Sequence, residues 1–150
     1  MSQPPLQVSS HRDILTSAFE IDDFLEAAEA VLGTDMESLR TVTKTPSAES
    51  ALAAPFFGIG DHLMYEHPVQ RAAILASRIM RNHPLPDGNK RVALVLMRVY
   101  LPQNVWRLAA TPKEIDVMFR AVAAREHSED YFISWACRHT ERLEPRPATV

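Results

Sequence analysis

Residues 83–91 read His-Pro-Leu-Pro-Asp-Gly-Asn-Lys-Arg and lie between two segments that predict helices. Before them, residues 68–82 carry apolar side chains at helical spacing behind Pro68, which suits a first helical position. After them, residues 92–101 are apolar almost all round, as in a helix buried in a core, and Pro102 is expected to end it. The sequence therefore predicts a mainly α fold in which the motif joins an amphipathic helix to a central buried helix.

The rest of the chain predicts more helices and one small hairpin. Residues 21–32 have helical periodicity before Gly33, and a last pair of helices is expected after residues 111 and 128. The first of this pair opens with a capping box, Thr-Pro-Lys-Glu, and the second with Ser128. Their inward-facing side chains are expected to be Ile115, Met118, Phe119, Val122, Phe132, Trp135 and Ala136.

Three segments between residues 33 and 62 are less regular. Residues 34–46 are rich in Ser and Thr and predict a loop, followed by a short helix at 47–54. Residues 55–61, Pro-Phe-Phe-Gly-Ile-Gly-Asp, predict a small β-hairpin or flap. No βαβ alternation and no Gly-rich nucleotide loop occurs, so a parallel-sheet nucleotide fold is not indicated.

Length and composition limit the classes of function. The 150 residues fit one domain, which we expect to have a core at about 11–143 and mobile tails at 1–10 and 144–150. Sixteen basic and nineteen acidic residues give a formal charge of −3, so a nucleic-acid partner is not expected. The single Cys137 is expected to be a small buried apolar side chain. Neither a secretory signal nor a membrane span is apparent, so we expect a cytoplasmic protein with no membrane partner.

The motif contains the groups that phosphate transfer requires. Gly88 and Asn89 stand where the apolar helix begins, and unpaired backbone N–H groups at such a start attract phosphate. Asp87 is a single carboxylate, which suits Mg²⁺ held together with waters and phosphates. Lys90 and Arg91 can neutralise negative charge. His83 is the candidate base for an attacking hydroxyl.

A purely structural reading of the same residues is also possible. In that reading Asp87 caps the following helix, Asn89 bonds to the backbone, and the two cations are simply solvated. A turn explains the prolines and the glycine. It does not explain the imidazole, the amide and two cations together at these positions, so the catalytic interpretation is preferred.

The motif resembles the signature of the Fic family, His-Pro-Phe-x-(Asp or Glu)-Gly-Asn-Gly-Arg-x-x-Arg, which lies between two helices of an all-α domain. Leu85 replaces the aromatic residue of the signature. Lys90 stands in place of a glycine, and Leu94 stands in place of the second arginine. The sequence Asn-Lys-Arg without a second arginine is similar to the Doc (death-on-curing) branch of the family.

The Doc resemblance implies a toxin of a toxin–antitoxin pair that uses ATP and Mg²⁺ to phosphorylate a protein, in that branch elongation factor Tu. It implies His83 as the base and Asp87 as the metal ligand. It implies phosphate binding by Gly88, Asn89, Lys90 and Arg91, with Arg81 as a further candidate. Phosphoryl transfer is favoured because Leu94 stands in place of an arginine that would anchor the outer phosphates.

The resemblance also suggests a flap that positions the target backbone, with Phe56, Phe57 and Ile59 as candidates, although a role as local core residues is the preferred interpretation of these three. The inhibitory Ser/Thr-x-x-x-Glu-(Gly or Asn) helix of many Fic proteins is incomplete here, so a separate antitoxin is the expected inhibitor. Two other functions stay open. One is transfer of AMP to a protein hydroxyl, and the other is binding of a partner without catalysis.

Overall fold

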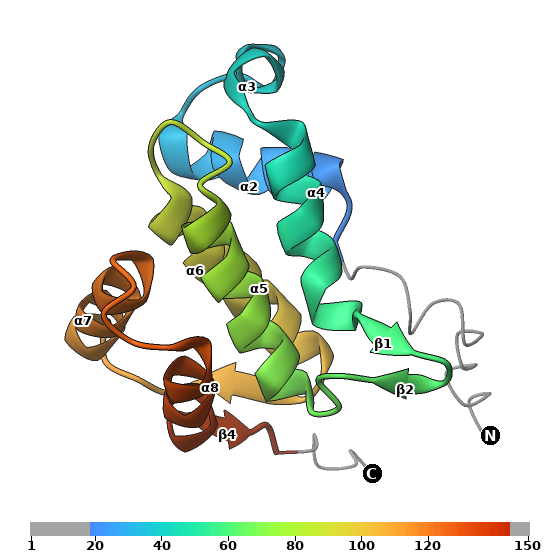
Figure 1. Cartoon of the computed structure of the whole chain (residues 1–150). Helices are drawn as coiled ribbons and strands as arrows, with labels where there is room; N and C mark the ends of the chain where they lie inside the picture. Colours follow the sequence, from blue (N-terminus) through green and yellow to red (C-terminus); the bar gives the residue numbers. More distant parts are fainter. Residues whose placement is uncertain (1–18, 145–150) are drawn as a thin grey trace, which may run out of the picture.

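The computed structural model describes residues 19–144 and is mainly α-helical, as predicted (Figure 1). The predicted N-terminal tail, the proposed start of the core at residue 11 and nearly all of the predicted C-terminal tail lie outside the described residues. The helices are α2 (Ile21–Leu32), α3 (Met36–Val42), α4 (Thr45–Ala53), α5 (Pro68–Asn82), α6 (Asn89–Gln103), α7 (Pro112–Ala123) and α8 (Glu129–Arg138). A 3₁₀ turn, η1 (Ala54–Phe56), follows α4. The strands are β1 (Gly58–Ile59), β2 (His62–Leu63), β3 (Trp106–Leu108) and β4 (Thr140–Arg142).

Helices α5 and α6 form the centre of the molecule. Pro68 occupies the first turn of α5, and the His67 ring accepts a hydrogen bond from the backbone N–H of Val69. Helix α5 packs against α4, α6, α7 and α8, so it is as central as the predicted apolar helix. Its buried side chains are Val69, Ala72, Ala73, Ile74, Leu75, Ala76, Ser77, Ile79 and Met80.

Helix α6 extends beyond the predicted 92–101 at both ends. It starts at Asn89, and Gly88, whose backbone is in the left-handed region, is its N-cap residue. It ends at Gln103, with Pro102 in its last turn. Val92, Met97 and Leu101 are fully buried, whereas Leu94 is only half-buried and Arg98 is exposed. This incompletely covered face of α6 becomes one wall of the candidate site.

The prediction of a loop at 34–46 was wrong. Asp35 accepts a hydrogen bond from the backbone N–H of Ser38 and so caps α3, while Glu29 accepts one from the N–H of Met36. The Thr43 hydroxyl donates to the Leu39 carbonyl, and α4 then begins at Thr45. Polar caps, which suggested a loop in the sequence, start and end a short helix here.

The other predicted helices are confirmed. Helix α2 has its predicted bounds, and Gly33 ends it in the left-handed conformation at φ 71°. Thr111 and Glu114 form the capping box of α7, and Ser128 caps α8. All seven side chains predicted to face inward from these last two helices are buried.

The strands differ more from expectation. The hairpin is present as β1 and β2, with Ile59 opposite His62. The pairing of β3 with β4 was not predicted, because two three-residue strands more than thirty residues apart give no local signal.

Cys137 was predicted to be buried but is exposed near the end of α8, so that prediction was wrong. Within residues 19–144, no helix has the length and apolar character that crossing a bilayer requires.

Candidate functional site

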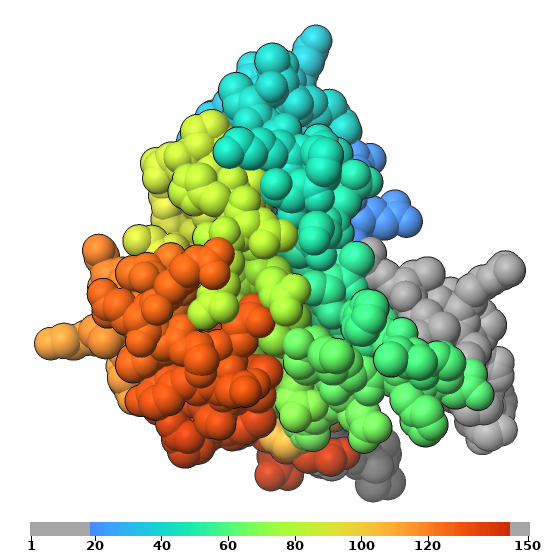
Figure 2. All heavy atoms as spheres, viewed as in Figure 1, coloured from blue at the N-terminus to red at the C-terminus, as the bar shows by residue number. Residues whose placement is uncertain are grey.

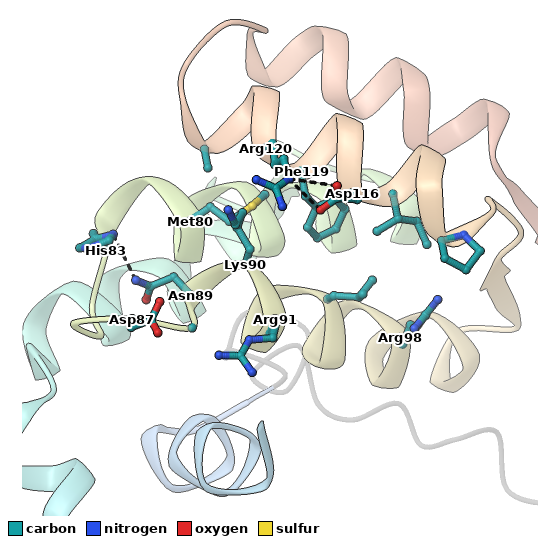
Figure 3. Close-up of a pocket in the computed structure, with 15 residues that line it drawn as sticks. Met80, His83, Asp87, Asn89, Lys90, Arg91, Arg98, Asp116, Phe119 and Arg120 are labelled. Carbon is teal, nitrogen blue, oxygen red and sulfur yellow. Dashed lines mark hydrogen bonds and ion pairs between the residues drawn. The ribbon is translucent and has the colours of Figure 1, made fainter. Parts of the chain in front are cut away.

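A cavity of about 670 Å³ lies between the loop at 83–91, whose last three residues are the first residues of α6, the rest of α6 and helix α7 (Figure 3). Its size is within the usual range of small-molecule sites. The residues that line it are Met80, His83, Asp87, Gly88, Asn89, Lys90, Arg91, Leu94, Arg98, Pro112, Ile115, Asp116, Phe119, Arg120 and Ala123. The structure therefore brings six of the predicted site residues, His83 and Asp87 to Arg91, to one cavity.

His83 is the residue that ends α5. Its backbone lies in the left-handed region at φ 51° and ψ 54°, and its N–H still bonds to the Ile79 carbonyl. Such a conformation is uncommon for a non-glycine residue, and Val105 and Arg125, which do not line the cavity, also have a positive φ. The imidazole is exposed, and its Nδ1 lies 3.1 Å from the side-chain nitrogen of Asn89.

Asn89 is only 5% exposed, and its amide is occupied by protein partners. Its oxygen accepts from the backbone N–H of Leu85 at 3.0 Å, and its nitrogen donates to the Leu85 carbonyl at 2.9 Å. The second hydrogen of that nitrogen lies toward His83. Asn89 thus forms the backbone contacts of the structural reading, and its predicted role as a phosphate ligand stays a prediction.

The loop is also held from outside. The N–H of Lys44, before α4, donates to the Pro84 carbonyl at 2.8 Å, and the Asn82 amide donates to the Ser47 carbonyl at 3.1 Å. Leu85 is buried at 1% exposure, so it fills the packing position of the aromatic residue in the signature. These contacts with α4 and the core therefore hold the loop in its shape.

Gly88 lets the loop approach α2 closely. Its φ is 87°, and a Cβ atom at this position would lie 2.6 Å from a methyl group of Leu32. Both the backbone conformation and the contact therefore favour glycine. Because Gly88 is the residue before α6, this close approach also positions the open N–H end of the helix at the cavity.

The charged groups of the cavity make it positive. Four cationic residues, Lys90, Arg91, Arg98 and Arg120, line the cavity together with two carboxylates, Asp87 and Asp116, which gives the lining a formal +2 on a chain of net −3. Lys90 points toward α7, whereas Arg91 points to the opposite side of α6, toward the end of α2 (Figure 3). Arg120 is bound by both oxygens of Asp116. The cavity therefore suits an anion.

Asp87 is exposed, and it is the acidic side chain nearest the start of α6. Residues 19–144 contain no group of three or more His, Cys, Asp or Glu side chains that could hold a metal ion. A lone carboxylate fits Mg²⁺, which keeps several waters and is usually completed by phosphate oxygens. The donor set thus fits a metal that arrives with a nucleotide, with Asp87 as its protein ligand.

Arg81 does not line the cavity. Its guanidinium donates to the His127 carbonyl at 2.8 Å, and its buried Nε has no hydrogen-bond partner in the described part of the chain. In this structure Arg81 therefore links the end of α5 to the segment before α8. Its predicted contact with the nucleotide has no support from this placement.

The candidate flap residues also lie away from His83. The β1–β2 hairpin precedes α5 and His83 ends it, so about 22 Å of helix separates them (Figure 1). In the space-filling view the green hairpin lies at the edge of the molecule (Figure 2). Phe57 and Ile59 are 55% and 78% exposed, while Phe56 is half-buried against Tyr100. The placement does not support a flap over His83, and for Phe56 it agrees with the reading as local core.

Sequence reasoning missed the wall that α7 contributes. Ile115 and Phe119 were predicted only as core, yet their side chains also border the cavity beside Leu94. The i, i+4 spacing of Asp116 and Arg120 was the available signal, but such pairs usually occur on solvated helix faces. Only the packing of α7 against α5 and α6 reveals that this pair faces a cavity.

The comparisons with known proteins agree with the motif. The model of the Fic/DOC family matches residues 10–101, which is more than half of the chain and includes the whole loop at 83–91. Searches of curated proteins and of solved structures gave no match. The matched region ends within α6, so α7 and its wall of the cavity lie outside it.

Proposed function

We propose that this chain, which belongs to the Fic/DOC family, is a Doc-like toxin that phosphorylates a Ser or Thr hydroxyl of a protein with ATP and Mg²⁺. Proteins of this family transfer phosphate or AMP to a protein hydroxyl, so a protein-modifying transferase is the broader conclusion. The observation that carries the proposal is the position of His83, Asp87 and Lys90 around one positively charged cavity.

The choice of phosphoryl rather than AMP transfer rests on two positions. Lys90 replaces a glycine of the family signature and places a cation, in place of bare backbone, at the start of α6. Leu94, one turn further on, is half-buried and borders the cavity without charge. Compared with the signature, the cation therefore lies one turn nearer the start of α6, which favours binding of the γ-phosphate there.

Each residue then has a defined part. The N–H groups at the start of α6, with Lys90, bind the phosphates and neutralise charge that develops during transfer. Arg91 points toward the end of α2 in this structure and would have to turn toward the cavity to join them. Leu94, Ile115 and Phe119 offer an apolar surface to the nucleoside. Asp87 would hold Mg²⁺, which when bound supplies further charge neutralisation. His83 takes the proton of the attacking hydroxyl.

The partners and the compartment belong to the same proposal. A toxin of this kind acts on the translation machinery in the cytoplasm, with elongation factor Tu as the first target to test, and a separate antitoxin inhibits it. The incomplete inhibitory sequence and the uncharged Leu94 support an inhibitor supplied by another chain. Neither a membrane nor a nucleic acid is proposed as a partner.

The test uses the full chain, Mg²⁺ and ATP labelled at either the α- or the γ-phosphate, with elongation factor Tu and a cell lysate as acceptors. Label from the γ-phosphate alone, absent with His83→Ala, is the expected result. Transfer of the α-label would instead indicate AMP transfer. Binding of ATP without transfer of either label to any protein would indicate the non-catalytic alternative. His62→Ala, a change to an exposed histidine of the hairpin, is the matched control.

A further inference from the structure

The polarity of the hydrogen bond between His83 and Asn89 can be deduced from the neighbouring backbone. The Asn89 oxygen faces the N–H of Leu85, and its nitrogen faces the carbonyl of the same residue. Rotating the amide by 180° would place oxygen against oxygen and N–H against N–H. The orientation of the amide is therefore fixed, and the group that faces His83 is an N–H donor.

The direction of this hydrogen bond determines which nitrogen of the neutral His83 ring carries the proton. A donor can bond to Nδ1 only if Nδ1 carries a lone pair, so neutral His83 has its proton on Nε2. In the Ser-His-Asp arrangement a carboxylate accepts from Nδ1–H and leaves Nε2 as the basic atom. In this protein the partner is a donor, and no hydrogen bond at Nε2 is recorded within residues 19–144.

We propose that Asn89 is a positioning residue that holds His83 in the Nε2–H form, so that Nδ1 is the atom that accepts the proton during transfer. This inference rests on the proposed function for its catalytic half, whereas the form of the ring is a property of the protein alone. In the structure Asn89 covers Nδ1, and the bond between them breaks as the acceptor hydroxyl reaches this atom.

The proposed step is balanced. The hydroxyl O–H bond breaks, and its proton forms the Nδ1–H bond of an imidazolium that also keeps Nε2–H. The electron pair left on oxygen forms a bond to the γ-phosphorus, and the bond from that phosphorus to the bridging oxygen breaks with its electrons leaving on ADP. An Asn89 N–H cannot remain bonded to Nδ1–H, so the exposed His83 ring separates from the amide in this step, while the amide keeps its two bonds to the Leu85 backbone.

The first experiment measures the ring in the unliganded full chain by long-range ¹⁵N–¹H NMR. The expected spectrum has protonated Nε2 and unprotonated, hydrogen-bonded Nδ1. In Asn89→Ala the Nδ1 resonance should shift to that of a nitrogen without a hydrogen bond. Asn104→Ala is the matched control, because Asn104 also lies at one end of α6 and donates to the carbonyl four residues earlier. A proton on Nδ1 in the wild type would overturn the proposal, and this result would not depend on any variant folding.

The second experiment replaces His83 with histidine methylated at one nitrogen. Methylation of Nε2 leaves Nδ1 basic, and we expect it to retain transfer of the γ-label to within about tenfold. Methylation of Nδ1 should lower transfer about 10²–10⁴-fold, as expected for loss of a general base. Loss of transfer on methylation of Nε2 would overturn the assignment of Nδ1. If the wild type transfers no label, the proposed function fails, whereas the NMR measurement still decides the state of the ring.

Discussion

The two ends of helix α5 carry the two features that the sequence marked as functional, and they differ in how firmly they are held. At the C-terminal end, the loop at 83–91 is fixed by buried Leu85 and Asn89 and by a hydrogen bond from Lys44. At the N-terminal end, the β1–β2 hairpin has two paired positions, and Phe57 and Ile59 are exposed. The difference teaches that a site which positions atoms for chemistry is built from buried contacts, while an exposed hairpin has few contacts to lose.

The largest expected difference between the two ends is in catalysis. His83→Ala should lower transfer of labelled phosphate about 10²–10⁴-fold, because it removes the base. His62→Ala, on the hairpin, should change the rate less than about twofold, since surface changes rarely matter. Melting temperatures of both variants check that the fold is intact. Equal effects of the two changes would remove the reason for placing the chemistry at the C-terminal end of α5.

Two glycines, Gly60 before α5 and Gly88 after it, allow the stability of the two ends of this helix to be compared. Gly88 and Gly60 both have positive φ, but only at Gly88 would a new Cβ meet another side chain, that of Leu32. Gly88→Ala should lower the free energy of unfolding by about 2–5 kcal/mol, combining backbone strain and overpacking. Gly60→Ala should cost about 1–2 kcal/mol from strain alone. Urea unfolding measures both, and Leu32→Ala should reduce the cost at Gly88.

Substitutions should change the affinity for nucleotide only where they lie in the loop at the C-terminal end of α5. Lys90→Gln should weaken binding of ATP about tenfold, because it removes a cation from the phosphate-binding end of the cavity. Lys113→Gln, an exposed change on α7 outside the cavity lining, should leave the affinity within about twofold. Calorimetric titration at two salt concentrations measures both, and the wild type should lose more affinity at high salt than Lys90→Gln does.

The smallest effect is expected at the exposed tip of the hairpin. Ile59→Ser should change the free energy of unfolding by less than about 0.5 kcal/mol, because the side chain is 78% exposed. Its distance along α5 from His83 predicts a rate of target modification within about twofold of the wild type. A fall of tenfold or more, with ATP binding unchanged, would show that the hairpin contacts the target after all and would restore the flap interpretation.

Local sequence signals predicted the helices that have their own caps and stripes. Thr111 with Glu114, Ser128 and Gly33 each act within one turn of chain, so α2, α7 and α8 were recognisable. Helix α3 was missed because Asp35 and Ser38 are equally common in loops. The pairing of β3 with β4 depends on residues distant in the sequence, which no local pattern encodes.

The sequence alone determined the chemical groups of the candidate site, because nine consecutive residues carry the imidazole, the carboxylate and two cations between two helices. Tertiary structure alone decided how these groups are arranged. The packing of α7 completes the cavity, and the distance along α5 separates the hairpin from His83. The Leu85 backbone fixes the orientation of the Asn89 amide, which is the basis of the proposed position of the proton on the His83 ring. Residue identity follows from the chain, whereas the direction of a hydrogen bond and the wall of a cavity depend on atoms that only folding brings together.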